Sequence, residues 1–247
     1  MAPYSWLLLA VAGLGAGAVN AVGGGGSMIS FPALLATGLP PIPANVTNAV
    51  AAAPGYLGGS LGYLPELAGQ RRRIVLLSLV SMVGALAGSL LLLQVPSDVF
   101  RSLVPWLIAG SAVLLAIQPA LKSRLRTRSP RTAALVTSQI VISIYGGFFG
   151  AGLGIMMLAA LGMFIDDSLH RINALKGLLS LVVGCVSALF FTLLAPVAWP
   201  EALALAVTGF LGGRLGVLVA RRIPARFIRW GVVCYGLILA IVLGVHW

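Results

Sequence analysis

The sequence predicts an all-α polytopic membrane protein made of two inverted repeats, each with about five hydrophobic segments and each beginning with a glycine-bent helical hairpin. Of its 247 residues, 60% are hydrophobic and only 9% are charged, whereas an average soluble domain has about 25% charged residues. Apolar runs recur along the whole chain, and the second half repeats motifs of the first. These observations exclude a water-soluble fold and leave no soluble domain of useful size.

Ten apolar segments follow one another, and eight of them approach the ~20 residues that a helix needs to cross a bilayer. The first has no basic region before it and no cleavage site after it, so we expect it to be retained in the membrane. Cys185 and Cys234 lie inside apolar runs, where a thiol behaves as a small hydrophobe, so no disulfide or metal site is expected. The predicted segments are residues 5–22, 27–39, 44–64, 74–94, 99–119, 132–149, 153–165, 172–195, 199–220 and 227–246.

The two short segments, 27–39 and 153–165, each follow a glycine-rich run, at residues 23–26 and 150–154. Glycine lets the backbone bend sharply, so we interpret each short segment as the second arm of a helical hairpin. The sequence leaves open whether each hairpin crosses the membrane fully or turns back partway.

The distribution of charge supports the hairpins. With them, three basic connections fall on one side of the membrane, and the other side carries only Arg101, with Asp98 and Glu201. The positive-inside rule makes the basic side cytoplasmic and predicts that both termini lie outside a bacterial cytoplasmic (inner) membrane. The net charge of +11 therefore indicates topology, and we expect no nucleic-acid partner. The basic connections contain Arg71–Arg73, Lys122–Arg131 and Arg221–Arg229.

An internal repeat relates the halves. Gly84–Gly88 has its counterpart 125 positions later in Gly209–Gly213, and Asn48 matches Asn173 at the same offset. With five segments per half, the second copy starts from the opposite face, which in transporters places the substrate near the midplane between the halves. We therefore predict a first membrane repeat at residues 1–119, a basic cytoplasmic linker at 120–131 and a second membrane repeat at 132–247.

The chain resembles the TauE/SafE sulfite exporter family of membrane permeases, also called TSUP. The resemblance covers nearly the whole length and rests on Ser27–Pro32 with the glycines before it, Gly147–Gly154, Asn173–Lys176 and the stretch from Gly209 to Pro224. It implies transport of small sulfur-containing or organic anions, such as sulfite, sulfonates or sulfoacetate. The family's first glycine motif often includes an aliphatic residue, whereas here four glycines stand together.

The hairpins are the first candidate for the substrate site. A second arm that begins at membrane depth presents free N–H groups and the positive end of its helix dipole, which suit an anion. Two such ends, near Ser27 and Ile155, could face one site from opposite sides. The alternative is that the glycines only permit tight helix packing, as at Gly84 and Gly88. The candidate residues are Gly24, Gly25, Gly26, Ser27, Gly150, Gly152 and Gly154.

Lys176 is the second candidate, because it lies about five residues deeper in the membrane than Arg171. A bare ammonium at a helix centre costs about 2.5–3.5 kcal/mol, so substrate contact or charge compensation in the pathway is the hypothesis, and snorkelling toward the headgroups is the alternative. Asn173 lies one turn earlier on the same face, and its repeat counterpart Asn48 could line the opposite wall.

Arg214 is predicted either to attract anions at the cytoplasmic mouth or to have a purely structural role. The acidic residues all fall in or beside connections, which disfavours a proton relay through buried acids. No nucleophile with its base and no cluster of metal ligands occurs at membrane depth, so we predict no catalytic residue, metal or cofactor.

The function predicted from these observations is an anion permease that works by alternating access around a midplane site. A passive anion channel and a non-transporting accessory subunit are the alternatives, and a membrane enzyme is disfavoured. The predicted partners are a small anionic substrate and the lipid bilayer, and the small-residue helix faces also permit a homo-oligomer.

Overall fold

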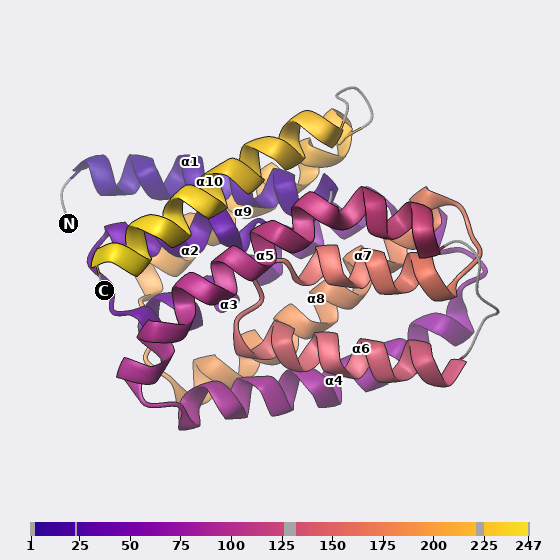
Figure 1. Ribbon diagram of the computed structural model, residues 1–247, viewed down its shortest axis with the longest axis horizontal. Coiled ribbons are helices and arrows are strands. Elements are labelled where there is room, and N and C mark those ends of the chain that lie inside the picture. Colours follow the sequence, from indigo (N-terminus) through magenta and orange to yellow (C-terminus); the bar gives the residue numbers. More distant parts are fainter. Residues whose placement is uncertain (1–2, 23, 126–131, 221–224, 247) are drawn as a thin grey trace.

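A computed structural model describes residues 3–22, 24–125, 132–220 and 225–246, and within them it contains ten α-helices, one short 3₁₀ helix and no strand. This confirms the predicted all-helical membrane fold with eight long helices and two short arms (Figure 1). The helices are α1 (Pro3–Val22), α2 (Ser27–Ala36), α3 (Pro41–Leu61), η1 (Leu64–Leu67), α4 (Arg71–Gln94), α5 (Ser97–Leu125), α6 (Thr132–Phe148), α7 (Leu153–Phe164), α8 (Leu169–Leu194), α9 (Trp199–Ala220) and α10 (Ala225–His246).

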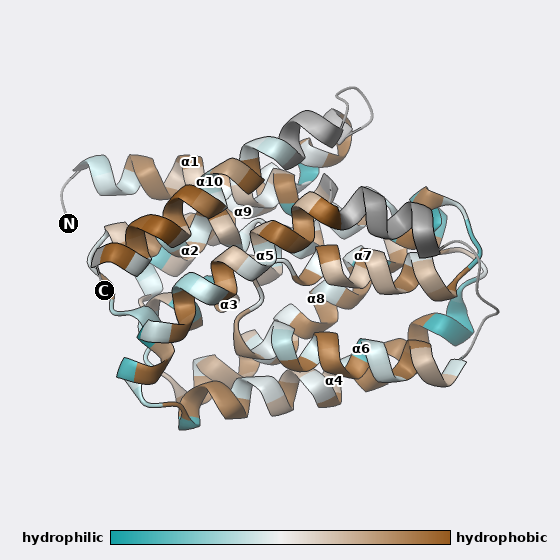
Figure 2. Ribbon diagram, viewed as in Figure 1, coloured by the Kyte–Doolittle hydropathy of each residue, from teal (hydrophilic) through white to brown (hydrophobic). Residues whose placement is uncertain are grey.

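Five of the described helices are long and apolar enough to cross a membrane by length and composition: α1, α4, α5, α8 and α9. Figure 2 shows apolar residues along the helix bodies and hydrophilic residues concentrated near the two ends of the bundle. The arms α2 and α7 have 10 and 12 residues. At 1.5 Å per residue they reach about 15 and 18 Å, roughly half of the ~30 Å hydrocarbon core, so neither arm is long enough to cross it.

Helix α5 is longer than the predicted apolar segment 99–119. Helix α5 continues to Leu125, so residues 120–125, which we assigned to the linker, are helical. A helix that extends past the bilayer loses its apolar signal at the headgroups while its backbone hydrogen bonds continue. The rest of the linker, 126–131, and the basic residues Arg221 and Arg222 lie outside the described residues.

Helix pairing follows the two halves of the chain. Extensive contacts join α1 to α9 and α4 to α6. In each pair the first helix of one half packs against the fourth long or short helix of the other half. Likewise α3 contacts α9 as α8 contacts α4, while α3 contacts α8 and α5 contacts α10. This is the pattern that a two-fold relation between the halves requires, with each half completing the other.

Glycines allow the closest of these helix crossings. A Cβ added to Gly84 of α4 would lie 2.7 Å from the Cβ of Ser143 in α6, and its counterpart Gly209 in α9 lies against Gly13 of α1. Small residues let helix backbones approach in a membrane, where packing rather than water exclusion drives association. For these helix-interior glycines the packing interpretation is therefore correct.

Candidate functional site

The two glycine bends meet at the centre of the bundle. A Cβ added to Gly24 would lie 2.6 Å from the Cα of Gly154, and one added to Gly154 would lie 2.9 Å from the Cα of Gly24. The beginnings of α2 and α7 therefore touch backbone to backbone, with the side chain of Ile155 beside Gly25. The sequence predicted two helix ends that approach from opposite sides, and the structure brings them into direct contact.

Lys176 is buried next to this contact, with 2% of its surface exposed. Its Nζ donates a hydrogen bond to the backbone carbonyl oxygen of Asn20, 3.0 Å away. Its Cδ lies 3.4 Å from the position that a Cβ on Gly154 would take, so the alkyl chain passes over the second bend. Buried at that depth, the ammonium does not snorkel to the headgroups.

The partner of Lys176 is the C-terminal end of α1. The last carbonyls of a helix have no intrahelical donor and carry the negative end of the dipole, so they favour a cation. Asn173, one turn before Lys176, donates from Nδ2 to the carbonyl oxygen of Ala21 at 3.3 Å. Among the described residues no carboxylate pairs with Lys176, so helix carbonyls hold its charge.

A small cavity of about 10 Å³ adjoins Lys176, and we call it the Lys176 cavity. Two polar atoms in its lining are buried without a hydrogen-bond partner, the hydroxyl of Ser60 and Oδ1 of Asn173. The ammonium also has three N–H donors and only one hydrogen bond. Two groups that can donate, the Ser60 hydroxyl and the Lys176 ammonium, therefore border this cavity together with one free acceptor, Oδ1 of Asn173. Its lining comprises Asn20, Ala21, Gly55, Tyr56, Gly59, Ser60, Tyr63, Asn173, Lys176, Gly177 and Ser180.

A second cavity of about 20 Å³ follows along α3, and we call it the Asn48 cavity. The Ser30 hydroxyl donates to Oδ1 of Asn48 at 2.5 Å within it. Asn48, which we predict could line the wall opposite Lys176, borders this neighbouring cavity. It lies two turns of α3 before Gly55, which borders both cavities. The Asn48 cavity is lined by Gly13, Ala16, Gly17, Asn20, Ser30, Asn48, Ala51, Ala52, Gly55, Leu205 and Gly209.

Asn20 separates the two cavities, and the sequence analysis missed it. The residue borders both, and its Oδ1 accepts a hydrogen bond of 2.7 Å from the N–H of Gly26, across the first bend. Tyr145 is the counterpart of Asn20 in the second half, 125 positions later. It bonds across the second bend by donating to the carbonyl oxygen of Ala151 at 2.7 Å. A polar residue in an apolar segment just before a glycine run was the available signal.

Replacing Asn20 with alanine is expected to destabilise the protein by about 1–3 kcal/mol, because the Gly26 N–H would lose its acceptor inside the membrane. Thermal unfolding in detergent measures the loss. Asn20→Asp keeps an acceptor at the same place and should lose less. An Asn20→Ala variant that melts at the wild-type temperature would show that the bend does not depend on this bond.

The remaining hairpin candidates are parts of the bends. Ser27 is buried at the start of α2 and hydrogen-bonds with Tyr56. Gly25, Gly150 and Gly152 have positive φ angles of 96°, 76° and 77°. Ser111 of α5 donates to the carbonyl oxygen of Ala151 at 2.9 Å and so closes the second bend. Ser27 and the three glycines line neither of the two cavities, whereas Tyr56 borders the Lys176 cavity.

Arg214 lies outside both cavities. It is exposed on α9, on the face with Leu211 and Leu218, while Gly212 and Gly216 on the other face contact α1. Arg214 does not line either cavity, and both interpretations of it, attraction of anions at the cytoplasmic mouth and a purely structural role, stay predictions.

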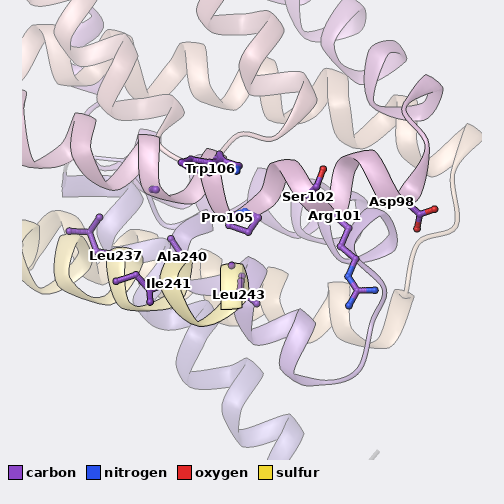
Figure 3. A pocket seen from close by; sticks show the side chains of 11 residues that line it. Asp98, Arg101, Ser102, Pro105, Trp106, Leu237, Ala240, Ile241 and Leu243 are labelled. Atoms are coloured by element: carbon purple, nitrogen blue, oxygen red, sulfur yellow. The ribbon is translucent and has the colours of Figure 1, made fainter. Parts of the chain in front are cut away.

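A larger groove of about 580 Å³ lies between α5 and α10, at the periphery (Figure 3). Asp98, Arg101 and Ser102 form its polar end, and Trp106, whose surface is 77% exposed, lies along it opposite apolar residues of α10. None of its lining residues borders the Lys176 or Asn48 cavity. An apolar surface of this kind in a membrane helix pair suits lipid chains.

Comparison with known proteins is consistent with this membrane architecture. A family model described as sulfite exporter TauE/SafE matches residues 9–243. A probable membrane transporter protein of Haemophilus influenzae is 29% identical over 212 residues, which cover 85% of this chain and 82% of that protein. The probable membrane transporter protein YfcA of Escherichia coli K12 is 29% identical over 209 residues (81% and 75%), and ORF9 of a Sinorhizobium species, also named a probable membrane transporter protein, is 27% identical over 235 residues (94% and 90%).

Proposed function

Because the chain belongs to the sulfite exporter TauE/SafE family and is a multi-pass membrane transporter, we propose that it carries small sulfur-containing or organic anions through the Lys176 cavity. Sulfite, short sulfonates and sulfoacetate are the substrate class. The bacterial inner membrane is the proposed location, in keeping with the bacterial relatives.

The observation that carries the proposal is the buried ammonium of Lys176. Its only hydrogen bond is to a backbone carbonyl, and it has no carboxylate partner among the described residues. Burying an unpaired cation is unfavourable, and a bound anion would offset that cost. Charged residues inside a membrane often mark substrate pathways for this reason. The unpartnered Ser60 hydroxyl, 5% exposed, offers a further donor to the same anion.

Alternating access is the proposed mechanism. The two cavities follow each other along α3 with Asn20 between them, and their volumes of about 20 and 10 Å³ suffice for about one water each. An oxyanion with several heavy atoms needs more space, so the helices around it must separate before it binds. Contacts between the halves, such as Gly24 with Gly154, are where the separation would occur, as expected for inverted repeats.

The orientation proposed is one with both termini outside. The two termini lie at the same end of the bundle, and α4 begins with three arginines at the opposite end (Figure 1). Positive charge in connections favours the cytoplasm, so that end is assigned to the cytoplasmic side.

The test is uptake of labelled sulfite and of a short sulfonate into proteoliposomes that contain the purified wild type. We expect saturable uptake that empty liposomes lack. Preloading the liposomes with unlabelled substrate should accelerate uptake, because a carrier returns faster when loaded, whereas a passive channel shows no such stimulation. No flux of either anion by folded protein, under any imposed pH or voltage gradient, would contradict the proposal and favour an accessory subunit.

A further inference from the structure

Asp167, in the connection between α7 and α8, forms ion pairs with two arginines from different halves of the chain. Its Oδ2 lies 3.0 Å from Nη1 of Arg73 at the start of α4, and its Oδ1 lies 2.9 Å from Nε of Arg171 in α8. The backbone N–H of Ser168 also donates to Oδ1 at 2.9 Å. The carboxylate thus bridges the first half to the second.

Backbone hydrogen bonds strengthen this bridge. Nη1 of Arg171 donates to the carbonyl oxygen of Ala68 at 3.0 Å, in the connection between α3 and α4. In return, Nε2 of the buried Gln70 donates to the carbonyl oxygen of Arg171 at 3.2 Å. The α3–α4 connection and the beginning of α8 are therefore held together at the end of the bundle to which Arg73 belongs.

This junction lies next to one end of the Lys176 cavity. Ser60 and Tyr63 line the cavity immediately before the connection that Arg171 holds. On the other side, Lys176 follows Arg171 by five residues, about 7.5 Å along the helix. The α3–α4 connection and α8, whose residues line the cavity, are thus held together beside it by the contacts around Asp167.

We propose that Arg73 and Arg171 form a second anion site, at the cytoplasmic mouth, which the Asp167 carboxylate occupies as an internal ligand while the mouth is closed and which a sulfite or sulfonate oxyanion takes over during transport. The inference rests on the proposed anion transport. Guanidinium groups present several N–H donors in a plane and bind carboxylate and other oxyanions with the same geometry. One anion can therefore replace the other without a change in the arginines.

The pairs are suited to exchange. The side chains of Arg73 and Arg171 are 43% and 33% exposed, and ion pairs at such sites contribute little net stability. Burial acts to raise the pKa of Asp167, but the hydrogen bonds from Ser168 and the two arginines outweigh it and hold that pKa below its ordinary value. Because the pKa of Asp167 is lower in the folded than in the unfolded protein, the stability that the bridge contributes is fully present above the unfolded pKa. It is lost only as the pH falls through the folded pKa, so the carboxylate is charged at neutral pH.

The test uses a cysteine reporter in the Lys176 cavity. Cys185 and Cys234 are both free and exposed, so they are first replaced by alanine, and Ser60→Cys is introduced. A membrane-impermeant maleimide is then applied to inverted bacterial membrane vesicles, whose outer face is cytoplasmic. Asp167→Asn and Arg73→Gln should each raise the labelling rate of the reporter, by about fivefold. Asp166→Asn, an exposed neighbour outside the bridge, is the matched control and should not change it.

The affinity for substrate distinguishes an anion site from a simple latch. With sulfite or a short sulfonate presented on the cytoplasmic face, Asp167→Asn should lower the KM because the internal competitor is gone, whereas Arg73→Gln should raise it because a donor is gone. Unchanged labelling in both variants, or KM shifts in the same direction, would overturn the inference. If no anion is transported at all, the labelling experiment still decides whether the bridge closes the mouth, so the two failures are distinguishable.

Discussion

Replacing Lys176 with alanine is expected to lower the initial rate of sulfite or sulfonate uptake by about 10- to 100-fold, the factor that ~1.5–3 kcal/mol for a hydrogen bond to a charged group gives. The ammonium is 2% exposed, and within the described residues no carboxylate pairs with it, so its removal takes the positive charge from the cavity. Uptake into proteoliposomes measures the effect.

Two further variants separate charge from shape. Lys176→Met keeps most of the alkyl chain over Gly154 and should lose as much uptake as Lys176→Ala, while Lys176→Arg should keep a measurable part. Every variant also removes or alters the bond to the Asn20 carbonyl, so a monodisperse elution profile in detergent must first show that it is folded. Full uptake by folded Lys176→Met would exclude Lys176 from the pathway and leave it as a cap of α1.

The helices were predictable because an apolar run of membrane length has few alternatives to a helix. Segment 132–149 corresponds to α6, Thr132–Phe148, almost residue for residue. Helix α8 begins three residues before the predicted segment, since its first turn contains the polar residues His170 and Arg171. Helix α3 begins at Pro41, before the predicted segment, because proline fits the first turn of a helix. Hydropathy therefore shows which residues lie inside the membrane, but it does not show where the backbone hydrogen bonds of each helix begin and end.

Only those parts of the candidate site whose residues are close together in the sequence could be predicted from the sequence. Lys176 and Asn173 share a face by helical spacing alone, and their depth already indicated a functional charge. Their hydrogen-bond partners are the backbone carbonyls of Asn20 and Ala21. These lie more than 150 positions away in the sequence, so only the fold could identify them. The same holds for Asp167, an acidic residue in a connection, whose importance depends on Arg73, 94 positions earlier.

Replacing Gly24 with alanine is expected to destabilise the protein strongly. The residue has a φ of 87°, which costs an L-amino acid about 1–3 kcal/mol, and a new Cβ would lie 2.6 Å from the Cα of Gly154, against backbone that cannot rotate away. Overpacking of a tight site costs about another 1–3 kcal/mol. The sum predicts a loss of roughly 2–6 kcal/mol, seen as a lower melting temperature in detergent and a lower yield of folded protein.

Gly154→Ala isolates the contact from the backbone strain. Gly154 has no positive φ, so this variant adds only a Cβ, 2.9 Å from the Cα of Gly24, and should lose less stability than Gly24→Ala. Gly162→Ala, in the same helix with nothing within 4 Å, is the matched control and should be neutral or slightly stabilising. If Gly24→Ala were as stable as Gly162→Ala, the two bends would not be in contact in the membrane. Halves that meet at bare backbone can approach and separate without interlocking side chains, which is why a substitution here should impair transport even where the protein still folds.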